Sequence, residues 1–253
     1  MKKPRALHFT LTVLLLLFSI PQMACSLGAI LATPTPSSTP TPAYTPTNTP
    51  RPTLTPRPTA TPNATVTAQY NDMVQFVQDA ANAGYIDSAN GEYHRLDDYS
   101  EAWAQINWYQ WMPTGHAPDD FVFRAHMAWE SASQTPDPSG CGILFRLQDD
   151  GDHYGFLITS DGQVHFILSE AYFNFGGKVY HGQNRSAGEI DFAMTAQGDT
   201  FNVFVNGNRL GAFYGHKDTM LSGELAYTVI SGTNKDYGTR CEITNAELWV
   251  LKP

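Results

Sequence analysis

The order of apolar and polar residues divides the chain into a short helical part and a long series of alternating segments. Near residue 65, apolar side chains begin to recur at three- and four-residue spacing: Val66, Tyr70, Met73, Val74, Val77 and Ala81. Gly84 follows as a stop signal. This spacing predicts one amphipathic helix over about residues 65–83.

Beyond the helix the pattern changes to period two. Apolar residues occupy every second position from Phe121 to Trp129, which predicts a strand buried on one face. The same pattern marks seven more segments: residues 142–148, 153–159, 163–170, 190–196, 200–205, 223–230 and 243–251. Asp161-Gly162 and Asn206-Gly207 are hairpin signals, because both central positions of a type I′ turn need a positive φ. Antiparallel strands without intervening helices predict an all-β sandwich or barrel.

The N-terminal residues have the layout of an export signal. A short basic head precedes an apolar run over residues 11–20, which is too short to span a bilayer and predicts a signal peptide over residues 1–24. Gln22-Met23-Ala24-Cys25 resembles the bacterial lipobox, although that motif usually has Leu where Gln22 stands. The resemblance implies a lipid on Cys25. Ordinary cleavage, which would release a free secreted protein, is the alternative.

Thr-Pro pairs dominate the next segment, so we expect residues 25–63 to be a disordered linker. Proline fixes φ and removes backbone donors, which favours extended polyproline II over helix or sheet. Fully extended, the Pro-rich part would reach on the order of 90 Å. We therefore expect an exported protein at the outer face of the bacterial cell envelope, with a single β-sandwich domain over residues 64–253 held away from the membrane.

Charge and cysteine count limit the partners and the compartment. Five of the 15 basic residues precede residue 64 and all 24 acidic residues follow it, so the rest of the chain has a formal charge of −14. Nucleic acid and anionic lipid are therefore not expected as partners, and membrane contact should come through the lipid anchor only. With Cys25 assigned to the lipid, Cys141 and Cys241 remain, and an oxidising compartment favours a disulfide between them. Two buried, unpaired thiols are the alternative.

Several short segments resemble the concanavalin A-like lectin and glucanase superfamily, in this order along the chain: Phe121-Val122-Phe123-Arg124, the segment 140–146, an Asp-rich turn followed by Tyr154, Ser160-Asp161-Gly162, and Phe204-Val205-Asn206-Gly207. The most similar subgroup is the laminin G-like and 3-keto-disaccharide hydrolase-like domains of bacterial surface lipoproteins. The resemblance covers about residues 97–253 and implies two stacked antiparallel sheets, a jelly-roll sandwich. It also implies sugar binding on the concave face or at its rim, and an early strand within residues 99–111.

An enzyme would need a complete catalytic set, which the sequence does not supply. Glu189 and Asp191 resemble part of a retaining glucanase motif, but Ala193 and Met194 stand where the second glutamate belongs. The chain has no Gly-x-Ser-x-Gly, His-Glu-x-x-His or Cys-x-x-Cys motif. We therefore name no catalytic residue and no cofactor.

One polar set lies opposite the apolar stripe of the predicted strands and is the candidate ligand site: Arg124, His126, Arg146, Gln148 and His165, with Asp191 and Asn202. If these strands form the concave sheet, their side chains are placed to bind sugar hydroxyls or a carboxylate. If they form the convex sheet, the set is an ordinary solvated face.

An aromatic segment and an acidic turn complete the candidates. We expect residues 171–183 to form a long loop whose rings, Tyr172, Phe175 and Tyr180, stack on sugars or fold back as a lid on the core. Asp149, Asp150 and Asp152 are either weak calcium ligands or a solvated hairpin tip.

Three functions follow from these patterns. The first is a non-catalytic, surface-tethered module that binds glycan or another extracellular ligand. The second is a glycoside-cleaving enzyme that resembles the 3-keto-disaccharide hydrolases, with Arg146 binding substrate and His126 or His165 as base. The third is a structural or adhesive envelope protein.

Overall fold

The computed structural model describes residues 64–170, 172–216 and 220–252. These residues belong to one compact unit, Pro58–Pro253. The signal peptide, the lipidation of Cys25 and the Thr/Pro linker that the sequence predicts concern residues outside those described, and the side chain of each residue from 170 to 175 is likewise not described.

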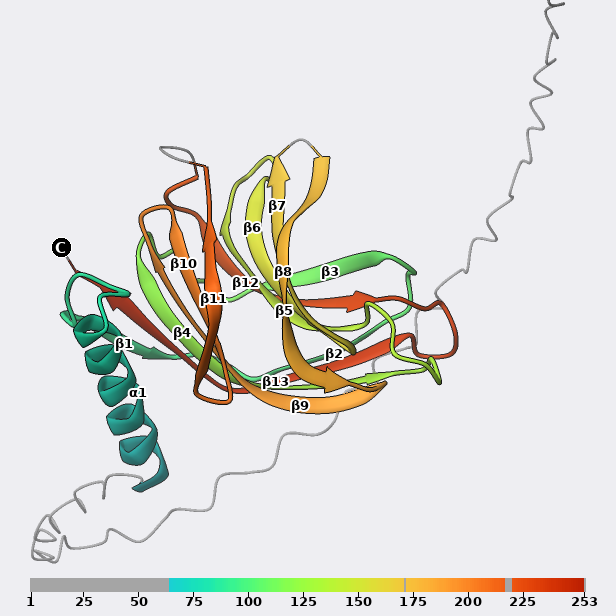
Figure 1. The fold of residues 1–253 in the computed structure, drawn as a ribbon, viewed down its shortest axis with the longest axis horizontal. Coiled ribbons are helices and arrows are strands. Elements are labelled where there is room, and N and C mark those ends of the chain that lie inside the picture. The colour runs from blue at the N-terminus through green and yellow to red at the C-terminus, as the bar shows by residue number, and fades with distance from the viewer. Residues whose placement is uncertain (1–63, 171, 217–219, 253) are drawn as a thin grey trace, which may run out of the picture. The chain divides into compact units, whose positions relative to one another are not determined.

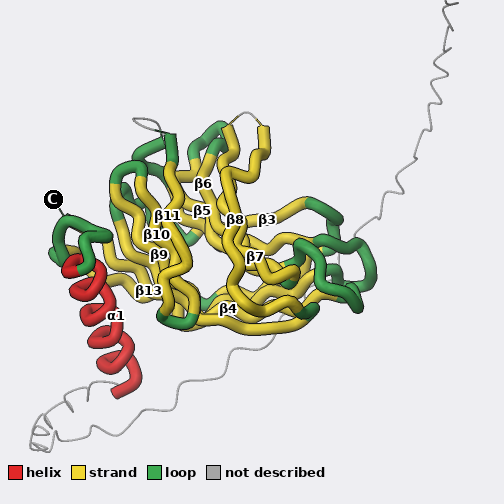
Figure 2. Tube along the Cα trace, in the orientation of Figure 1, coloured by secondary structure: helices red, strands yellow, loops and turns green. Residues whose placement is uncertain are grey.

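The domain begins with the predicted helix, α1 (Ala64–Asn82). Its apolar side faces the sandwich, where Met73 and Val77 are buried against Val122 and Trp249. Gly84 has a φ of 73° and ends the helix, because only glycine adopts this left-handed conformation without strain. Within the described residues, no helix combines the length and the apolar character that crossing a membrane requires. Figure 2 shows α1 as the one helix drawn, at one end of the strands.

All other named elements are strands, which pair antiparallel in two sheets (Figure 1). The seven-stranded sheet has the order β1-β13-β4-β9-β10-β11, and β2 also pairs with β13. Its strands are β1 (Gly91–Arg95), β2 (Tyr99–Trp103), β4 (Phe121–Ser131), β9 (Ala187–Gln197), β10 (Thr200–Val205), β11 (Asn208–Tyr214) and β13 (Thr239–Leu251). The turn between β10 and β11 is the predicted hairpin, since Asn206 and Gly207 have φ values of 49° and 77°.

The six-stranded sheet has the order β3-β12-β5-β6-β7-β8. Its strands are β3 (Trp108–Pro113), β5 (Gly140–Leu147), β6 (His153–Thr159), β7 (Asp161–Glu170), β8 (Tyr172–Asn184) and β12 (Glu224–Ser231). The early strand expected within residues 99–111 is therefore two strands, β2 and β3, which belong to different sheets.

The inward faces of the two sheets share one large core. Alternate residues of most strands enter it, as with Phe121 and Phe123 of β4 and with Tyr154 and Phe156 of β6. Rings from the two sheets meet directly, since Phe145 and Phe201 lie 4.9 Å apart in an edge-to-face arrangement. This confirms the all-β, two-sheet antiparallel sandwich with one N-terminal helix.

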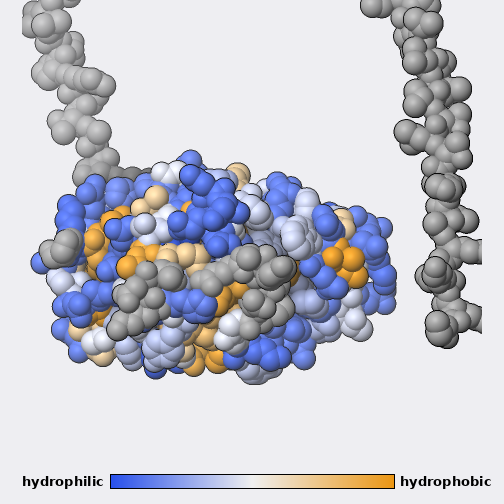
Figure 3. Space-filling view, turned by 90° about the horizontal axis from the view of Figure 1, so that it is seen from above, coloured by the Kyte–Doolittle hydropathy of each residue, from blue (hydrophilic) through white to orange (hydrophobic). Residues whose placement is uncertain are grey.

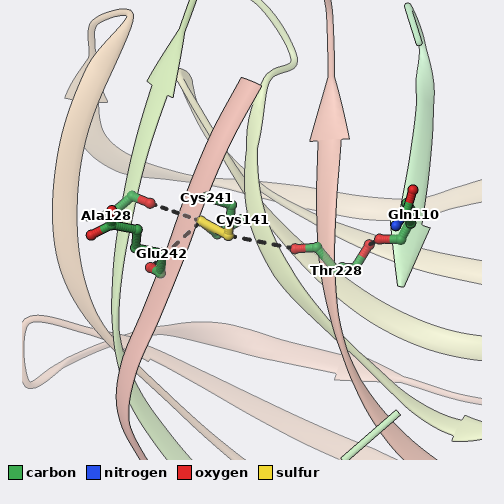
Figure 4. Close-up of a disulfide and its surroundings, with 6 residues drawn as sticks. All are labelled: Gln110, Ala128, Cys141, Thr228, Cys241 and Glu242. Carbon is green, nitrogen blue, oxygen red and sulfur yellow. Dashed lines mark hydrogen bonds between the residues drawn. A yellow bond between two sulfur atoms is a disulfide. The ribbon is translucent and has the colours of Figure 1, made fainter. Parts of the chain in front are cut away.

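A disulfide joins the two sheets inside this core. Cys141 of β5 and Cys241 of β13 are bonded, with their Cα atoms 5.3 Å apart (Figure 4). The Sγ atom of Cys141 lies 3.0 Å from the carbonyl oxygen of Ala128. A disulfide sulfur has no hydrogen to donate, so we treat this as a close contact and not as a hydrogen bond.

The aromatic segment is not the long loop that we expected. Residues Tyr172–Asn184 form the edge strand β8, which pairs with β7 from Glu170↔Tyr172 to Asp161↔Asn184. The pairing shifts register between Phe166 and Ile167, opposite Gly176 and Gly177. This irregularity interrupts the period-two pattern at the two glycines. For this reason the sequence of residues 171–183 predicts a loop and not a strand.

Candidate functional site

The predicted polar set does not converge, because its members belong to both sheets. Arg124 and His126 lie on the outward face of the seven-stranded sheet, where the Nδ1 atom of His126 lies 2.9 Å from Oδ1 of Asp191. Asn202, on the same face, is buried and accepts hydrogen bonds from the Arg209 guanidinium. His165 lies on the outward face of the other sheet, opposite Leu157. The expectation of one shared face is therefore wrong.

Arg146 points inward, contrary to its predicted position. Its φ of 53° lies in the left-handed region, at an irregularity in the pairing of β5 with β12. The side chain is 1% exposed, lies over the ring of Phe201 and donates a hydrogen bond to the carbonyl oxygen of Asp119. Burial lowers its pKa. A guanidinium enclosed in this way does not reach a ligand at the surface, so the enzyme hypothesis loses its substrate-binding residue.

The remaining predicted ligand residues lie apart. Tyr180 is 54% exposed near the end of β8 that pairs with Gln163. The side chains of Tyr172 and Phe175 fall outside the described residues. Tyr180 does not line the large cleft at the edge of the six-stranded sheet.

That cleft opens where β3, β5 and β12 meet the β5–β6 turn, and we call it the rim cleft. Its volume is about 720 Å³. The lining residues are Trp111, Ala117, Leu147, Gln148, Asp149, Asp150, Gly151, Gly223 and Glu224. Such a volume lies within the range of small-molecule sites, which is roughly 300–1,000 Å³.

A chain of buried hydrogen bonds fixes one wall of the rim cleft. The Nδ1 atom of His153 lies 2.7 Å from the carbonyl oxygen of Gly151, and a carbonyl only accepts, so Nδ1 carries the proton. Burial lowers the pKa of His153, which favours the neutral ring. Its Nε2 atom then accepts from the Tyr109 hydroxyl at 2.8 Å. Burial raises the pKa of Tyr109 to about 12, which keeps that hydroxyl protonated.

Backbone and side-chain hydrogen bonds together hold the acidic turn. The amide of Gly151 donates to the carbonyl of Gln148, and the amide of Asp152 donates to Oδ1 of Asp150 at 3.1 Å. The Gln148 side chain donates to the carbonyls of Arg146 and Ser222. Among the described residues, no group of three or more His, Cys, Asp or Glu side chains is arranged to hold a metal. These contacts are those of a turn at the tip of the β5–β6 hairpin.

Trp111 forms the aromatic side of the rim cleft. It is 39% exposed and its ring lies 6.1 Å from the ring of His153 and 5.9 Å from that of Tyr109. Side chains alternate along a strand, so Met112 points to the other face of β3, whereas the Trp108 ring stacks on the Tyr109 ring at 5.7 Å. The rim cleft therefore has one indole surface, supported from behind by two buried rings.

The electrostatics of the rim cleft are one-sided. Its lining includes three carboxylates, from Asp149, Asp150 and Glu224, and the amide of Gln148, with no lysine, arginine or histidine among the described lining residues. Carboxylates accept hydrogen bonds from hydroxyl groups, and an exposed indole stacks on apolar C–H surface. A neutral polyhydroxylated ligand satisfies both, whereas an anionic ligand would be repelled.

Sequence reasoning missed Trp111 and Glu224 as site residues. Trp111 was assigned only to an early strand, and Glu224 begins β12 next to Gly223, whose φ is 143°. The signal for Trp111 was the alternation within residues 108–113, which sets Tyr109 and Trp111 on one side. The sequence does not reveal that this edge strand borders the acidic turn, because β3 pairs with the distant strand β12.

Figure 3 shows one face of the molecule as mostly hydrophilic, with separate hydrophobic patches. Much of the exposed apolar surface comes from β3 and the residues before it: Ile106, Trp108, Trp111 and Met112, which are 39–50% exposed. Exposed apolar residues beside a polar cleft are typical of binding surfaces.

No protein-family model and no curated protein matches the chain. Among solved structures, the carbohydrate-binding module CBM66 from Bacillus subtilis is 9% identical, with a TM-score of 0.47 over 61% of this chain and 94% of that one. The Bacillus licheniformis β-glucanase is 10% identical, with a TM-score of 0.43 over 64% and 94%. Sheep galectin-11 is 14% identical, with a TM-score of 0.38 over 57% and 98%. At these values the likenesses carry no argument about ligand or activity.

Proposed function

We propose that this chain is a non-catalytic, surface-tethered module that binds a neutral glycan in the rim cleft. The observation that carries the proposal is the exposed indole of Trp111 beside three carboxylates, those of Asp149 and Asp150 on a turn held by hydrogen bonds and that of Glu224 at the start of β12. The apolar face of a pyranose stacks on the indole while its hydroxyls donate to Asp149, Asp150 and Glu224. The acidic lining selects against uronic acids and sulfated sugars.

The geometry of the turn supports binding without rearrangement. His153 and Gln148 hold the backbone of residues 146–152 through hydrogen bonds of 2.7–2.8 Å. A site that is already ordered loses little conformational entropy when the ligand arrives. The rim cleft is therefore arranged for binding by the free protein.

A glycan array with the purified full chain tests this function, with neutral, uronic acid and sulfated glycans on the same array. We expect neutral glycans to bind, and Trp111→Ala to weaken binding by about 30-fold, which corresponds to a central aromatic contact of about 2 kcal/mol. Tyr214→Ala is the control, because Tyr214 is an aromatic residue that is 66% exposed on β11 of the other sheet, away from the rim cleft. It should bind as the wild type does.

Other outcomes would favour the other two functions. Neutral glycans that bind and are then cleaved, with cleavage lost in Asp149→Asn and Glu224→Gln, would establish a glycoside hydrolase. An array on which no glycan binds would leave the structural or adhesive role. Equal loss in Trp111→Ala and Tyr214→Ala would remove the rim cleft as the site.

Tethering is a separate part of the proposal and rests on Cys25 and the Thr/Pro-rich segment. We expect a bacterial host to retain the wild-type chain in its membrane fraction and to release Cys25→Ala into the medium. Incorporation of labelled palmitate should likewise depend on Cys25. A chain that is secreted with Cys25 intact and unlabelled would instead be processed by ordinary cleavage.

A further inference from the structure

A second cleft lies between α1 and the outward face of the seven-stranded sheet, and we call it the helix cleft. Its volume is about 250 Å³. The residues that carry the argument are Gln69 and Asp72 of α1, Arg124 of β4, Asp191 of β9 and Glu247 of β13. This cleft is too small for an oligosaccharide and shares no lining residue with the rim cleft.

Arg124 is the cation of the helix cleft. It is half-buried, with its guanidinium 5.4 Å from the ring of Phe76, and it makes no hydrogen bond or ion pair with any described residue. Its Nη1 atom is buried without an acceptor. A buried charged donor without an acceptor is costly, so the site favours an incoming anion. A carboxylate matches the planar donors of a guanidinium.

Glu247, opposite Arg124 in the pairing of β13 with β4, does not take that place. Its side chain is 5% exposed and accepts a hydrogen bond from the Tyr93 hydroxyl at 3.0 Å. Burial raises the pKa of Glu247, which disfavours its charged form. The β13 bulge between Thr244 and Glu247 turns Asn245 toward α1, where Gln69 donates to it at 2.8 Å.

The other polar residues of the helix cleft favour a ligand group that donates hydrogen bonds. Asp72 and Asp191 are exposed carboxylates on opposite walls, and the Oε1 atom of Gln69 is buried with no donor among the described residues. The lining thus has one guanidinium that acts on Glu247 only through its charge, without a hydrogen-bonded anion, and two exposed carboxylates. A simple anion would meet the carboxylates, and a simple cation would meet Arg124. One ligand that carries both charges satisfies both ends.

We infer that the helix cleft binds a small zwitterion of the α-amino acid class, with its carboxylate on Arg124 and its ammonium group toward Asp72 and Gln69. The size of the cleft limits the ligand to one small molecule. The contact between His126 and Asp191 at 2.9 Å closes one side of the cleft, so the side chain of the amino acid would extend toward solvent on the open side.

Isothermal titration calorimetry of the purified full chain against the twenty common L-amino acids tests this inference. Acetate and ethanolamine, which carry one charged group each, are the comparison probes. We expect at least one amino acid to bind at least tenfold more tightly than either probe. No heat from any amino acid, or acetate binding as tightly as the best amino acid, would overturn the inference.

Two variants locate the site. Arg124→Met keeps a side chain over Phe76 but removes the charge. Asp72→Asn changes only an exposed side chain of α1, so this variant should fold as the wild type does. Each should weaken amino acid binding at least tenfold. The matched control is Arg240→Met on the same sheet, because Arg240 already pairs with Glu130 at 3.1 Å and lies over the Tyr237 ring. Unchanged binding in both Arg124→Met and Asp72→Asn, or equal loss in Arg240→Met, would refute the assignment.

Discussion

The Tyr109 hydroxyl offers a direct test of how the rim cleft is held. Tyr109→Phe removes the donor to Nε2 of His153, which is 2% exposed, and leaves that nitrogen buried without a partner. An unsatisfied buried acceptor costs about 1–3 kcal/mol, and because Tyr109 itself is only 5% exposed, water does not replace the lost hydroxyl. We expect this loss in the free energy of unfolding.

Urea denaturation at pH 8 measures that loss. The pKa of His153 is lowered from 6.5 by burial, so at pH 8 the ring is neutral in both folded and unfolded chains and protonation does not contribute. Tyr214→Phe is the control, because Tyr214 is 66% exposed and its change should stay within about 0.5 kcal/mol. A Tyr109→Phe loss no larger than that of the control would refute the reasoning.

The same substitution should also loosen the turn locally. Without the Tyr109 hydroxyl, the His153 ring is held less firmly, so its hydrogen bond to the Gly151 carbonyl weakens. We expect the amide of Gly151, which donates to Gln148, to exchange with deuterium at least about fivefold faster. Exchange at wild-type rate would mean that the turn is held by its own backbone alone.

Two further predictions concern stability. The double variant Cys141→Ala/Cys241→Ala removes a disulfide whose cysteines are 100 residues apart in sequence. It should lower the free energy of unfolding, measured in urea, by about 4–5 kcal/mol, mainly by slowing folding. A loss below about 2 kcal/mol would contradict an origin in loop entropy. Because burial raises the pKa of Glu247 above 4.5, Glu247 favours the folded state below that pH and loses this contribution as the pH rises through its folded pKa. Glu247→Gln should therefore gain stability relative to the wild type between pH 4.5 and pH 7, and the opposite trend in urea titrations would show that Glu247 is stabilised as an anion.

The fold was predictable because its signals are local. The three- and four-residue spacing before Gly84 gave α1 to within about a residue, and the Asn206-Gly207 pair marked a turn whose φ values are both positive. Alternating burial along β4 reflects one face on the shared core. Each of these features depends on neighbours in sequence, so no knowledge of strand pairing was needed.

The candidate site was predicted poorly because it depends on pairing. Strict alternation predicts that Arg146 and Arg124 lie on one face. Arg146 itself has a left-handed backbone conformation in β5, and its side chain therefore points into the core. Alternation also does not say to which sheet a strand belongs, so His126 and His165 were grouped although they lie on different sheets. The aromatic segment was misread because two glycines interrupt β8. Such irregularities do not recur at a fixed spacing in the sequence. They become visible only when the pairing with the neighbouring strands is known.

The two proposed sites lie in different sheets, and this separation has a consequence for their coupling. The rim cleft belongs to the six-stranded sheet, and the helix cleft lies on the outward face of the other sheet, with no lining residue in common. The disulfide and the aromatic core tie the sheets into one unit. Coupling between sites needs an element with two states that both ligands bias. A saturating amino acid should therefore leave glycan affinity unchanged, and Trp111→Ala with Arg124→Met should each affect only its own ligand. A change in glycan affinity of more than about threefold on adding the amino acid would show that the sandwich transmits a conformational change.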